Sequence, residues 1–114
     1  KAMTAGCTME ACHFRDIGAE YAEVGAQRVG ISIDKPASQS KFDQKHGLGY
    51  PLLSDPDRSV ARRYGVARPL PLFPNKRATF VIGSDRRVLA AIVSETDMTK
   101  HADEALDVLR GAHA

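Results

Sequence analysis

The sequence predicts an α/β fold, a mixed sheet with helices on both of its faces. Helical and strand signals alternate along the chain in the order helix, strand, helix, strand, helix, hairpin, helix. A strand–helix–strand unit followed by an antiparallel hairpin and a closing helix is typical of such a sheet. The 114 residues leave room for one hydrophobic core, and 43% hydrophobic with 26% charged residues is ordinary for a globular protein. We therefore expect a single domain over residues 1–114.

An apolar stripe predicts the first helix, which spans about four turns. Its residues recur at intervals of three and four: Ala11, Phe14, Ile17, Tyr21 and Val24. Gly25 follows, where a glycine commonly ends a helix. At the other end, Cys7 falls at or just before the first turn, and Glu10 stands three positions later, where acidic residues are favoured. The pattern alone thus places Cys7 at a helix N-terminus.

A strand and a second helix come next. Alternating apolar residues from Val29 to Ile33 predict a strand of about six residues. Pro36 suits the first position of a helix that runs to about His46 and is ended by Gly47.

A short extended piece at 51–53 leads into the third helix. Asp55 and Pro56 are predicted to be its N-cap and first residue, and residues 64–65 to end it. The stretch 68–75 holds three prolines, so it can form neither a regular helix nor a central strand.

The last part of the chain predicts a hairpin and a closing helix. Strands at 79–82 and 88–93 are joined by a polar turn at 83–86. The closing helix has one apolar face, made by Met98, Ala102, Ala105, Leu106 and Leu109.

Composition and charge exclude several classes of protein. The longest apolar run, 88–93, is far shorter than the ~20 residues that span a bilayer, so we expect no membrane segment. Sixteen basic and fourteen acidic residues give a net charge of +2 with both signs mixed, which argues against nucleic-acid binding. Two cysteines do not make a disulfide framework, and no signal peptide is visible, so we expect a cytoplasmic location.

One element of the expected sheet has no counterpart in the sequence. Open α/β folds keep their sites at the carboxyl edge of the sheet, so a parallel strand should precede the helix that begins near Cys7. The residues before Cys7 are too few to form it. We therefore expect an N-terminally truncated domain.

Cys7 is the strongest candidate for chemistry. A thiol at a helix N-terminus faces unpaired backbone N–H groups and the positive end of the helix dipole, and both favour the thiolate. Such surroundings lower the pKa of a cysteine below its ordinary value of about 8.5. Thr4 supplies a hydroxyl three positions earlier, and Gly6 is small enough to permit a close approach to the backbone.

Cys12 lies five residues after Cys7, and this spacing has a geometric consequence. On an intact α-helix the two Cα atoms stand roughly 8.6 Å apart, beyond the ~7 Å limit for a disulfide. The thiols can join only if the first turn or two unwinds, which would make the pair a redox switch. Two other interpretations stay open: either cysteine can be a buried apolar residue, and Cys7, Cys12 and His13 can bind zinc, although no fourth ligand is evident.

Residues 4–16 (TAGCTMEACHFRD) resemble the active-site segment of peroxiredoxins of the Q type, the bacterioferritin comigratory protein subfamily. The resemblance continues, in the family's order, through 29–34 (VGISID), 50–55 (YPLLSD), 64–66 (YGV) and 77–82 (RATFVI). It covers nearly the whole chain. It implies a thioredoxin-like mixed sheet flanked by helices, with the family's N-terminal strands missing from this chain.

The resemblance also implies a peroxidase that needs no cofactor. Cys7 matches the peroxidatic cysteine, which attacks hydrogen peroxide or an organic hydroperoxide and becomes a sulfenic acid. Cys12 matches the resolving cysteine, which forms an intramolecular disulfide with Cys7 that thioredoxin or a similar dithiol reduces. Thr4 matches the hydroxyl that orients the peroxide, and Arg77 matches the guanidinium that stabilises the thiolate. Glu10 is expected either to brace Arg77 or only to favour the helix start.

Other functions stay open on the sequence alone. A general disulfide oxidoreductase is disfavoured because four residues rather than two separate the cysteines. A redox-sensing interaction module would use the same oxidation to expose its unwound helix to a partner, and an inert thioredoxin-like fragment would keep Cys7 as an ordinary thiol. We expect a monomer rather than a dimer. Surface or packing positions are expected for the histidines: His13, His46, His101 and His113.

Overall fold

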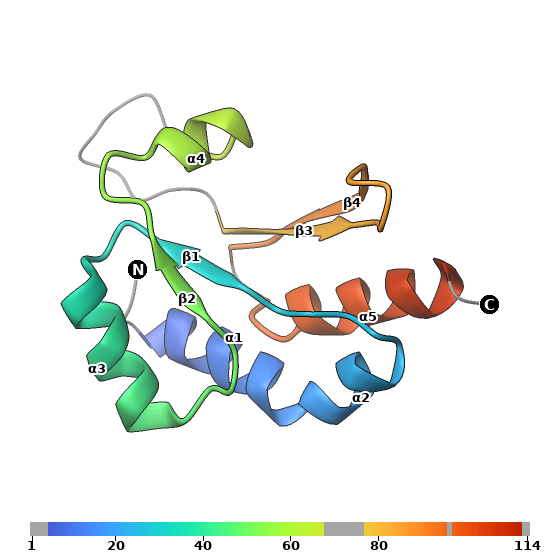
Figure 1. The fold of residues 1–114 in the computed structure, drawn as a ribbon, viewed down its shortest axis with the longest axis horizontal. Coiled ribbons are helices and arrows are strands. Elements are labelled where there is room, and N and C mark those ends of the chain that lie inside the picture. The colour runs from blue at the N-terminus through green and yellow to red at the C-terminus, as the bar shows by residue number, and fades with distance from the viewer. Residues whose placement is uncertain (1–4, 68–76, 96, 113–114) are drawn as a thin grey trace.

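The computed structural model describes residues 5–67, 77–95 and 97–112. Its elements, in chain order, are α1 (Ala5–Asp16), α2 (Gly18–Glu23), β1 (Gly30–Ser32), α3 (Pro36–His46), β2 (Leu52–Ser54), α4 (Ser59–Arg63), β3 (Ala78–Ile82), β4 (Val88–Val93) and α5 (Lys100–Ala112). The α/β fold class is confirmed (Figure 1). The proline-rich stretch 68–75 lies outside the described residues. No helix within them has the length and hydrophobicity that crossing a membrane requires.

The strands pair two by two. β1 lies parallel to β2, with Ile31 opposite Leu53, and β3 lies antiparallel to β4, with Thr79 opposite Ile92. In the described part of the chain the expected mixed sheet is therefore divided into a parallel and an antiparallel sheet. The two stay separate because no described strand bridges them. Helix α3 packs against β2, and α5 packs against both strands of the hairpin (Figure 1).

The first predicted helix is interrupted. The apolar stripe is continuous, but α1 ends at Asp16 and α2 begins at Gly18. The cause is Arg28, whose Nη1 donates to the backbone oxygen of Phe14 at 2.7 Å. In an uninterrupted helix that oxygen would accept the N–H of Gly18. The guanidinium also lies against Gly18, where a β-carbon would stand 3.1 Å from it. A side chain from beyond the helix thus divides one predicted helix into two.

The second predicted helix is confirmed, and the third begins later than expected. Helix α3 has the predicted bounds, and Gly47 follows it with a φ of 57°, the left-handed conformation that suits glycine at a helix end. Helix α4 begins at Ser59, not directly after Asp55. The carboxylate of Asp55 still caps it, because it accepts the N–H groups of Val60 at 3.1 Å and Ala61 at 2.9 Å. The N-cap position itself is Arg58, so the prediction of Asp55 as N-cap and Pro56 as first helical residue is wrong in position, because a turn at 56–57 lies between Asp55 and the helix.

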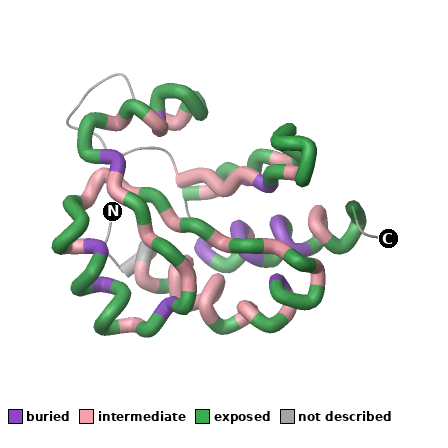
Figure 2. Tube along the Cα trace, in the orientation of Figure 1, coloured by how far each residue is buried: buried purple, intermediate pink, exposed green. Residues whose placement is uncertain are grey.

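Helix α5 carries the predicted apolar face. Met98 is buried, but it lies in a turn before the helix, because Asp97 acts as the cap and accepts the N–H of Lys100 at 3.2 Å. The core between α5, the hairpin and α2 is made by Tyr21, Val81, Ile92, Ala105 and Leu106. Tyr21 donates its hydroxyl to the backbone oxygen of Ala102 at 2.7 Å, so its one polar atom is satisfied. Figure 2 shows buried positions gathered along α5.

The parallel sheet turns apolar side chains outward. β1 spans three residues, fewer than expected, because its one partner among the described strands is the three-residue strand β2. Ile31 and Leu53, opposite each other in register, are 51% and 49% exposed. The alternation predicted the strand correctly, but here it marks an exposed face and not a buried one.

Candidate active site at the first turn of helix α1

The backbone places Cys7 where the sequence predicts it. Helix α1 begins at Ala5, so Cys7 is its third residue and lies in the first turn. Backbone N–H groups in the first turn have no acceptor within the helix and give that end a partial positive charge. The side chain of Cys7 and the whole of Thr4 lie outside the described part of the chain. The described site therefore consists of the groups around this turn.

The guanidinium of Arg77 packs against the first turn. Arg77 comes directly before β3 and is far from α1 in the sequence. A β-carbon on Gly6 would lie 2.7 Å from Nη1 and 3.2 Å from Nη2 of Arg77. The first distance is shorter than non-bonded atoms tolerate, so the lack of a side chain at Gly6 leaves the space that the guanidinium occupies. The fold thus brings Arg77 beside the residue that precedes Cys7.

Glu10 faces the same guanidinium. Its Oε2 atom lies 3.7 Å from Nη1 of Arg77, and the two side chains are 19% and 25% exposed. Burial raises the pKa of Glu10, and attraction to His101 and Arg77 offsets part of this rise. Removing the ionised carboxylate from water therefore costs free energy, and the neighbouring cation offsets part of that cost. The sequence left open whether Glu10 contacts Arg77 or only favours the start of the helix, and the structure shows the contact with Arg77.

Two further residues surround Arg77 and are not evident from the sequence. The Sδ atom of Met98 contacts Nη1 of Arg77. The backbone N–H of Arg77 donates to Oε1 of Glu95 at 3.4 Å. The apolar pattern predicted that Met98 would be buried, but periodicity carries no information about a partner in another element. Arg77 is thus contacted by two residues of the segment that connects β4 to α5.

Cys12 lies in the second half of α1 as a free thiol of intermediate exposure. The helix is continuous between this residue and the first turn. A disulfide between Cys12 and Cys7 therefore requires part of α1 to unwind.

The backbone of this second half is held by side chains from two connecting segments, Arg28 before β1 and Tyr50 before β2. Tyr50 donates its hydroxyl to the backbone oxygen of Ala11 at 2.9 Å, and Arg28 donates to that of Phe14 at 2.7 Å. The Arg28 guanidinium also lies 4.9 Å from the centre of the Tyr50 ring, within the range of a cation–π contact. Burial raises the pKa of Tyr50 to about 12, so its hydroxyl stays protonated and remains a donor at neutral pH.

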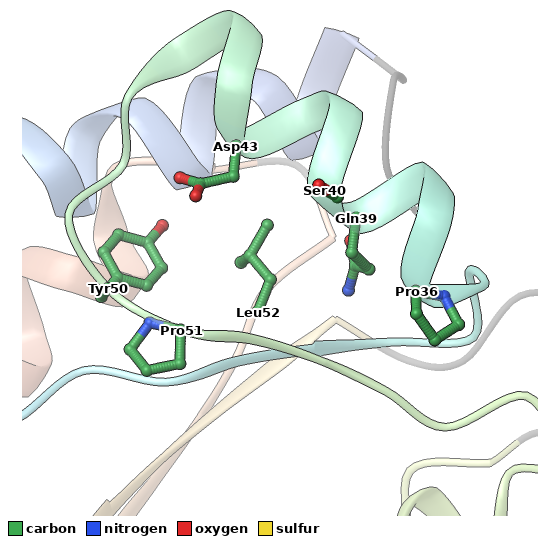
Figure 3. A pocket seen from close by; sticks show the side chains of 7 residues that line it. All are labelled: Pro36, Gln39, Ser40, Asp43, Tyr50, Pro51 and Leu52. Carbon is green, nitrogen blue, oxygen red and sulfur yellow. The ribbon is translucent and has the colours of Figure 1, made fainter.

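An open pocket of about 180 Å³ lies between α3 and β2. It is lined by Pro36, Gln39, Ser40, Asp43, Tyr50, Pro51 and Leu52. Figure 3 shows Leu52 between Tyr50 and Gln39. The polar groups here already have partners within the fold: Gln39 donates to the backbone oxygen of Leu53 at 2.9 Å, and Asp43 accepts the N–H of Leu48 at 3.1 Å. Of the predicted site residues that the structure describes, none lines this pocket, and its link to α1 is Tyr50.

No metal site is present among the described side chains. No three histidine, cysteine or carboxylate groups there lie close enough together to hold an ion. His13 instead contacts Asp103 of α5, with 2.8 Å between Nε2 and Oδ1. The zinc interpretation also needs the side chain of Cys7, which lies outside the described part.

Sequence comparison identifies the family. Residues 1–91 match the AhpC/TSA family. A protein of Mycobacterium tuberculosis strain H37Rv that carries the name peroxiredoxin is 56% identical over 111 residues, which cover 96% of this chain and 72% of that protein. The chloroplastic peroxiredoxin Q of Gentiana triflora is 38% identical over 111 residues, covering 96% of this chain and 50% of that protein.

Solved structures agree with the sequence comparison. The crystal structure of peroxidoxin BcpB from Mycobacterium tuberculosis matches with a TM-score of 0.95 at 53% identity, over 100% of this chain and 75% of that one. The bacterioferritin comigratory protein of Xanthomonas campestris, whose alkyl peroxide reduction activity was studied in trapped intermediate and ligand complexes, matches with a TM-score of 0.91 at 28% identity, over 100% of this chain and 75% of that one. The thioredoxin-like fold is thereby confirmed. The chain belongs to the AhpC/TSA family, on its Q-type peroxiredoxin branch.

Proposed function

We propose that this chain is a thiol-dependent peroxidase that reduces hydrogen peroxide and organic hydroperoxides through Cys7. The observation that carries the proposal is the guanidinium of Arg77 beside Gly6, at the helix turn that contains Cys7. Membership of the peroxiredoxin branch supports it, as does the alkyl peroxide reduction reported for the Xanthomonas campestris relative.

The first step is a displacement at oxygen. The Cys7 thiolate attacks one oxygen of the peroxide, a sulfur–oxygen bond forms and the O–O bond breaks. The electron pair of that bond leaves with the second oxygen, which takes a proton to give water or an alcohol, and Cys7 becomes a sulfenic acid. Thr4 orients the peroxide by its hydroxyl.

Arg77 lowers the barrier of this step by its charge. Negative charge moves from sulfur to the departing oxygen, and a fixed cation stabilises it at both positions. A guanidinium suits this role because it does not lose its proton and presents several donors in a rigid plane. Glu10 positions the guanidinium through their 3.7 Å contact.

The second step joins the two cysteines. Cys12 attacks the sulfur of the Cys7 sulfenic acid, a disulfide forms and water leaves. Helix α1 must unwind in part for this to occur, so the step is gated by a local conformational change. Thioredoxin or a similar dithiol then reduces the disulfide and restores both thiols.

The cycle needs neither a second subunit nor a cofactor. Both cysteines lie on one helix, so the disulfide closes within one chain, and sulfur carries the electrons throughout. We accordingly propose a monomer that works in the cytoplasm, where a dithiol reductant is at hand. Sedimentation of the reduced and oxidised protein tests the oligomeric state.

Substitution of each cysteine tests the proposal. Cys7→Ser should abolish peroxide consumption in the presence of thioredoxin and its reductase, and unchanged consumption would refute the assignment. Cys12→Ser should still form sulfenic acid at the wild-type rate, but turnover with thioredoxin should stall and over-oxidation should increase. A redox sensor would behave differently, because the wild-type protein would consume one equivalent of peroxide and then stop.

A further inference from the structure

His101 is a buried histidine that joins three elements beside the site. It lies near the start of α5 and is 0% exposed. Its Nε2 atom is 2.8 Å from the backbone oxygen of Ser94, after β4, and its Nδ1 atom is 2.9 Å from the hydroxyl of Thr79 on β3. A carbonyl oxygen only accepts, so Nε2 carries a proton. The Thr79 hydroxyl can donate or accept, so both ring nitrogens are satisfied in either protonation state of the ring.

The two groups that His101 holds are connected to Arg77. The N–H of Ser94 donates to the backbone oxygen of Arg77 at 3.3 Å. Thr79 stands two positions after Arg77 at the start of β3, where a period of two puts both residues on the same side of the chain. Met98, whose sulfur contacts the Arg77 guanidinium, lies three positions before His101. The backbone and the side chain of Arg77 are thus both set by segments that His101 fastens together.

We propose that His101 is a positioning residue, which keeps the Arg77 guanidinium against the first turn of α1 by tying Thr79 and Ser94 to the start of α5. This inference rests on the proposed role of Arg77 at Cys7. His101 acts through Arg77 and does not touch the peroxide. If its two hydrogen bonds are lost, the start of β3 and the turn that holds Met98 can move apart, and the guanidinium moves with them. A misplacement of about 1 Å in such a group costs on the order of a hundredfold in rate.

The test compares two substitutions of His101. His101→Leu removes both hydrogen bonds, whereas His101→Gln keeps an N–H that can reach Ser94. Two quantities are measured: the second-order rate constant of Cys7 oxidation by hydrogen peroxide, and the pKa of Cys7 from the pH dependence of its alkylation by iodoacetamide. His101→Leu should slow oxidation by roughly tenfold to a hundredfold and raise the pKa of Cys7. In His101→Gln the rate constant and the pKa should both lie close to the wild-type values. His46→Leu, on α3, is the matched control and should change neither.

The outcomes separate a positioning role from a merely structural one. If His101→Leu lowers the melting temperature but leaves both quantities unchanged, the proposal is overturned. Should His101→Leu fail to fold, Thr79→Val decides, because it removes only the hydroxyl. Thr79→Val should lower the oxidation rate constant and raise the pKa of Cys7, each by less than His101→Leu does. If neither quantity changes in Thr79→Val, the proposal is again overturned. Alkylation requires no peroxide, so a failure of the peroxidase function itself would be seen separately, as an absence of Cys7 oxidation in the wild-type protein.

Discussion

The two halves of helix α1 are held by different kinds of contact. The second half is fastened by hydrogen bonds to its backbone oxygens at Ala11 and Phe14. The first half is contacted by the charged side chain of Arg77, which occupies the space beside Gly6 and faces Glu10. Hydrogen bonds to a helix backbone do not depend on the redox state of a sulfur atom, whereas the position of a cation depends on the charges near it.

This difference predicts which half moves during the proposed cycle. Oxidation converts the Cys7 thiolate into a neutral sulfenic acid and so removes a negative charge from beside Arg77. The attraction that favours the closed first turn is then weaker, while the bonds at Ala11 and Phe14 are unchanged. We therefore expect the first half to unwind and carry Cys7 toward Cys12, which stays on the anchored half.

The largest expected effect comes from removing the cation. Arg77→Ala should slow the reaction of Cys7 with peroxide by on the order of 10²–10³-fold, because charge develops where the guanidinium stands. Arg77→Lys keeps the charge but lacks the planar set of donors, so its rate constant should lie between those of the wild type and Arg77→Ala. Stopped-flow measurement of peroxide consumption checks this, with Arg87→Ala at the exposed hairpin turn as the control. A rate constant unaffected by Arg77→Ala would remove Arg77 from the site.

A smaller effect is expected from filling the space beside Arg77. Gly6→Ala places a β-carbon 2.7 Å from Nη1 of Arg77, so the flexible guanidinium must move away. The oxidation rate should fall roughly tenfold to a hundredfold, although alanine favours a helix over glycine by up to about 1 kcal/mol. Gly111→Ala in α5 is a matched control, because nothing lies within 4 Å of its β-carbon position. An unchanged rate in Gly6→Ala would mean that the first turn tolerates a displaced cation.

Neutralising Glu10 separates stability from rate. Its pKa is raised by burial above the ordinary 4.5, so the folded protein holds this proton more tightly than the unfolded chain does. The free energy of unfolding therefore decreases as pH rises from about 4.5 through the raised pKa. Glu10→Gln removes the titrating carboxyl group, so the variant does not lose this part of its free energy of unfolding as the pH rises. The variant should melt at a higher temperature than the wild type at pH 7, and the difference should shrink as the pH falls toward 4.5.

The same substitution should slow the enzyme slightly. Without the carboxylate, Arg77 loses one of the groups that position it, and the peroxide rate should fall about two- to fivefold, the scale of a partly exposed ion pair. Glu104→Gln, on the exposed side of α5, is the control for both measurements. A lower melting temperature for Glu10→Gln at pH 7 would show that attraction to Arg77 outweighs the cost of burial.

The smallest effect on rate is expected in the second half of α1. Tyr50→Phe removes the hydrogen bond to Ala11, which contributes about 0.5–1.5 kcal/mol. Amide hydrogen exchange over residues 11–16 should accelerate about fivefold, the equivalent of 1 kcal/mol, while peroxide oxidation stays within about twofold of the wild type. Tyr64→Phe, at an exposed tyrosine, is the control. If Tyr50→Phe strongly accelerates disulfide formation, the second half must also open, and the division of the helix is wrong.

Much of the fold follows from signals between neighbours in the sequence. The glycines that end α2 and α3, the proline that begins α3 and the hairpin turn were all predicted, because turns and caps depend on local backbone chemistry. The position of Cys7 in the first turn of α1 was predicted for the same reason. For Gly6 the sequence predicted only that another group can approach the backbone closely, and it did not identify that group as Arg77.

Several features that the sequence did not predict arise from contacts between distant segments. Arg28 takes the oxygen of Phe14 and divides the first helix, although the apolar period is uninterrupted. Met98 contacts Arg77 and His101 bonds to Thr79 of β3, and an apolar period or a lone histidine does not indicate such a partner. Packing between elements decides these positions, and a single sequence does not record it.

The interruption at Ile17 has one more consequence. A continuous helix frays cooperatively, since each residue that leaves it weakens the hold on the next. Here the run of consecutive backbone bonds is broken between α1 and α2, and the oxygen at the boundary is occupied by Arg28. Melting that starts at the N-terminal end therefore meets a barrier before it reaches Tyr21. The hydrophobic core around that tyrosine is thereby separated from the unwinding that we propose for each turnover.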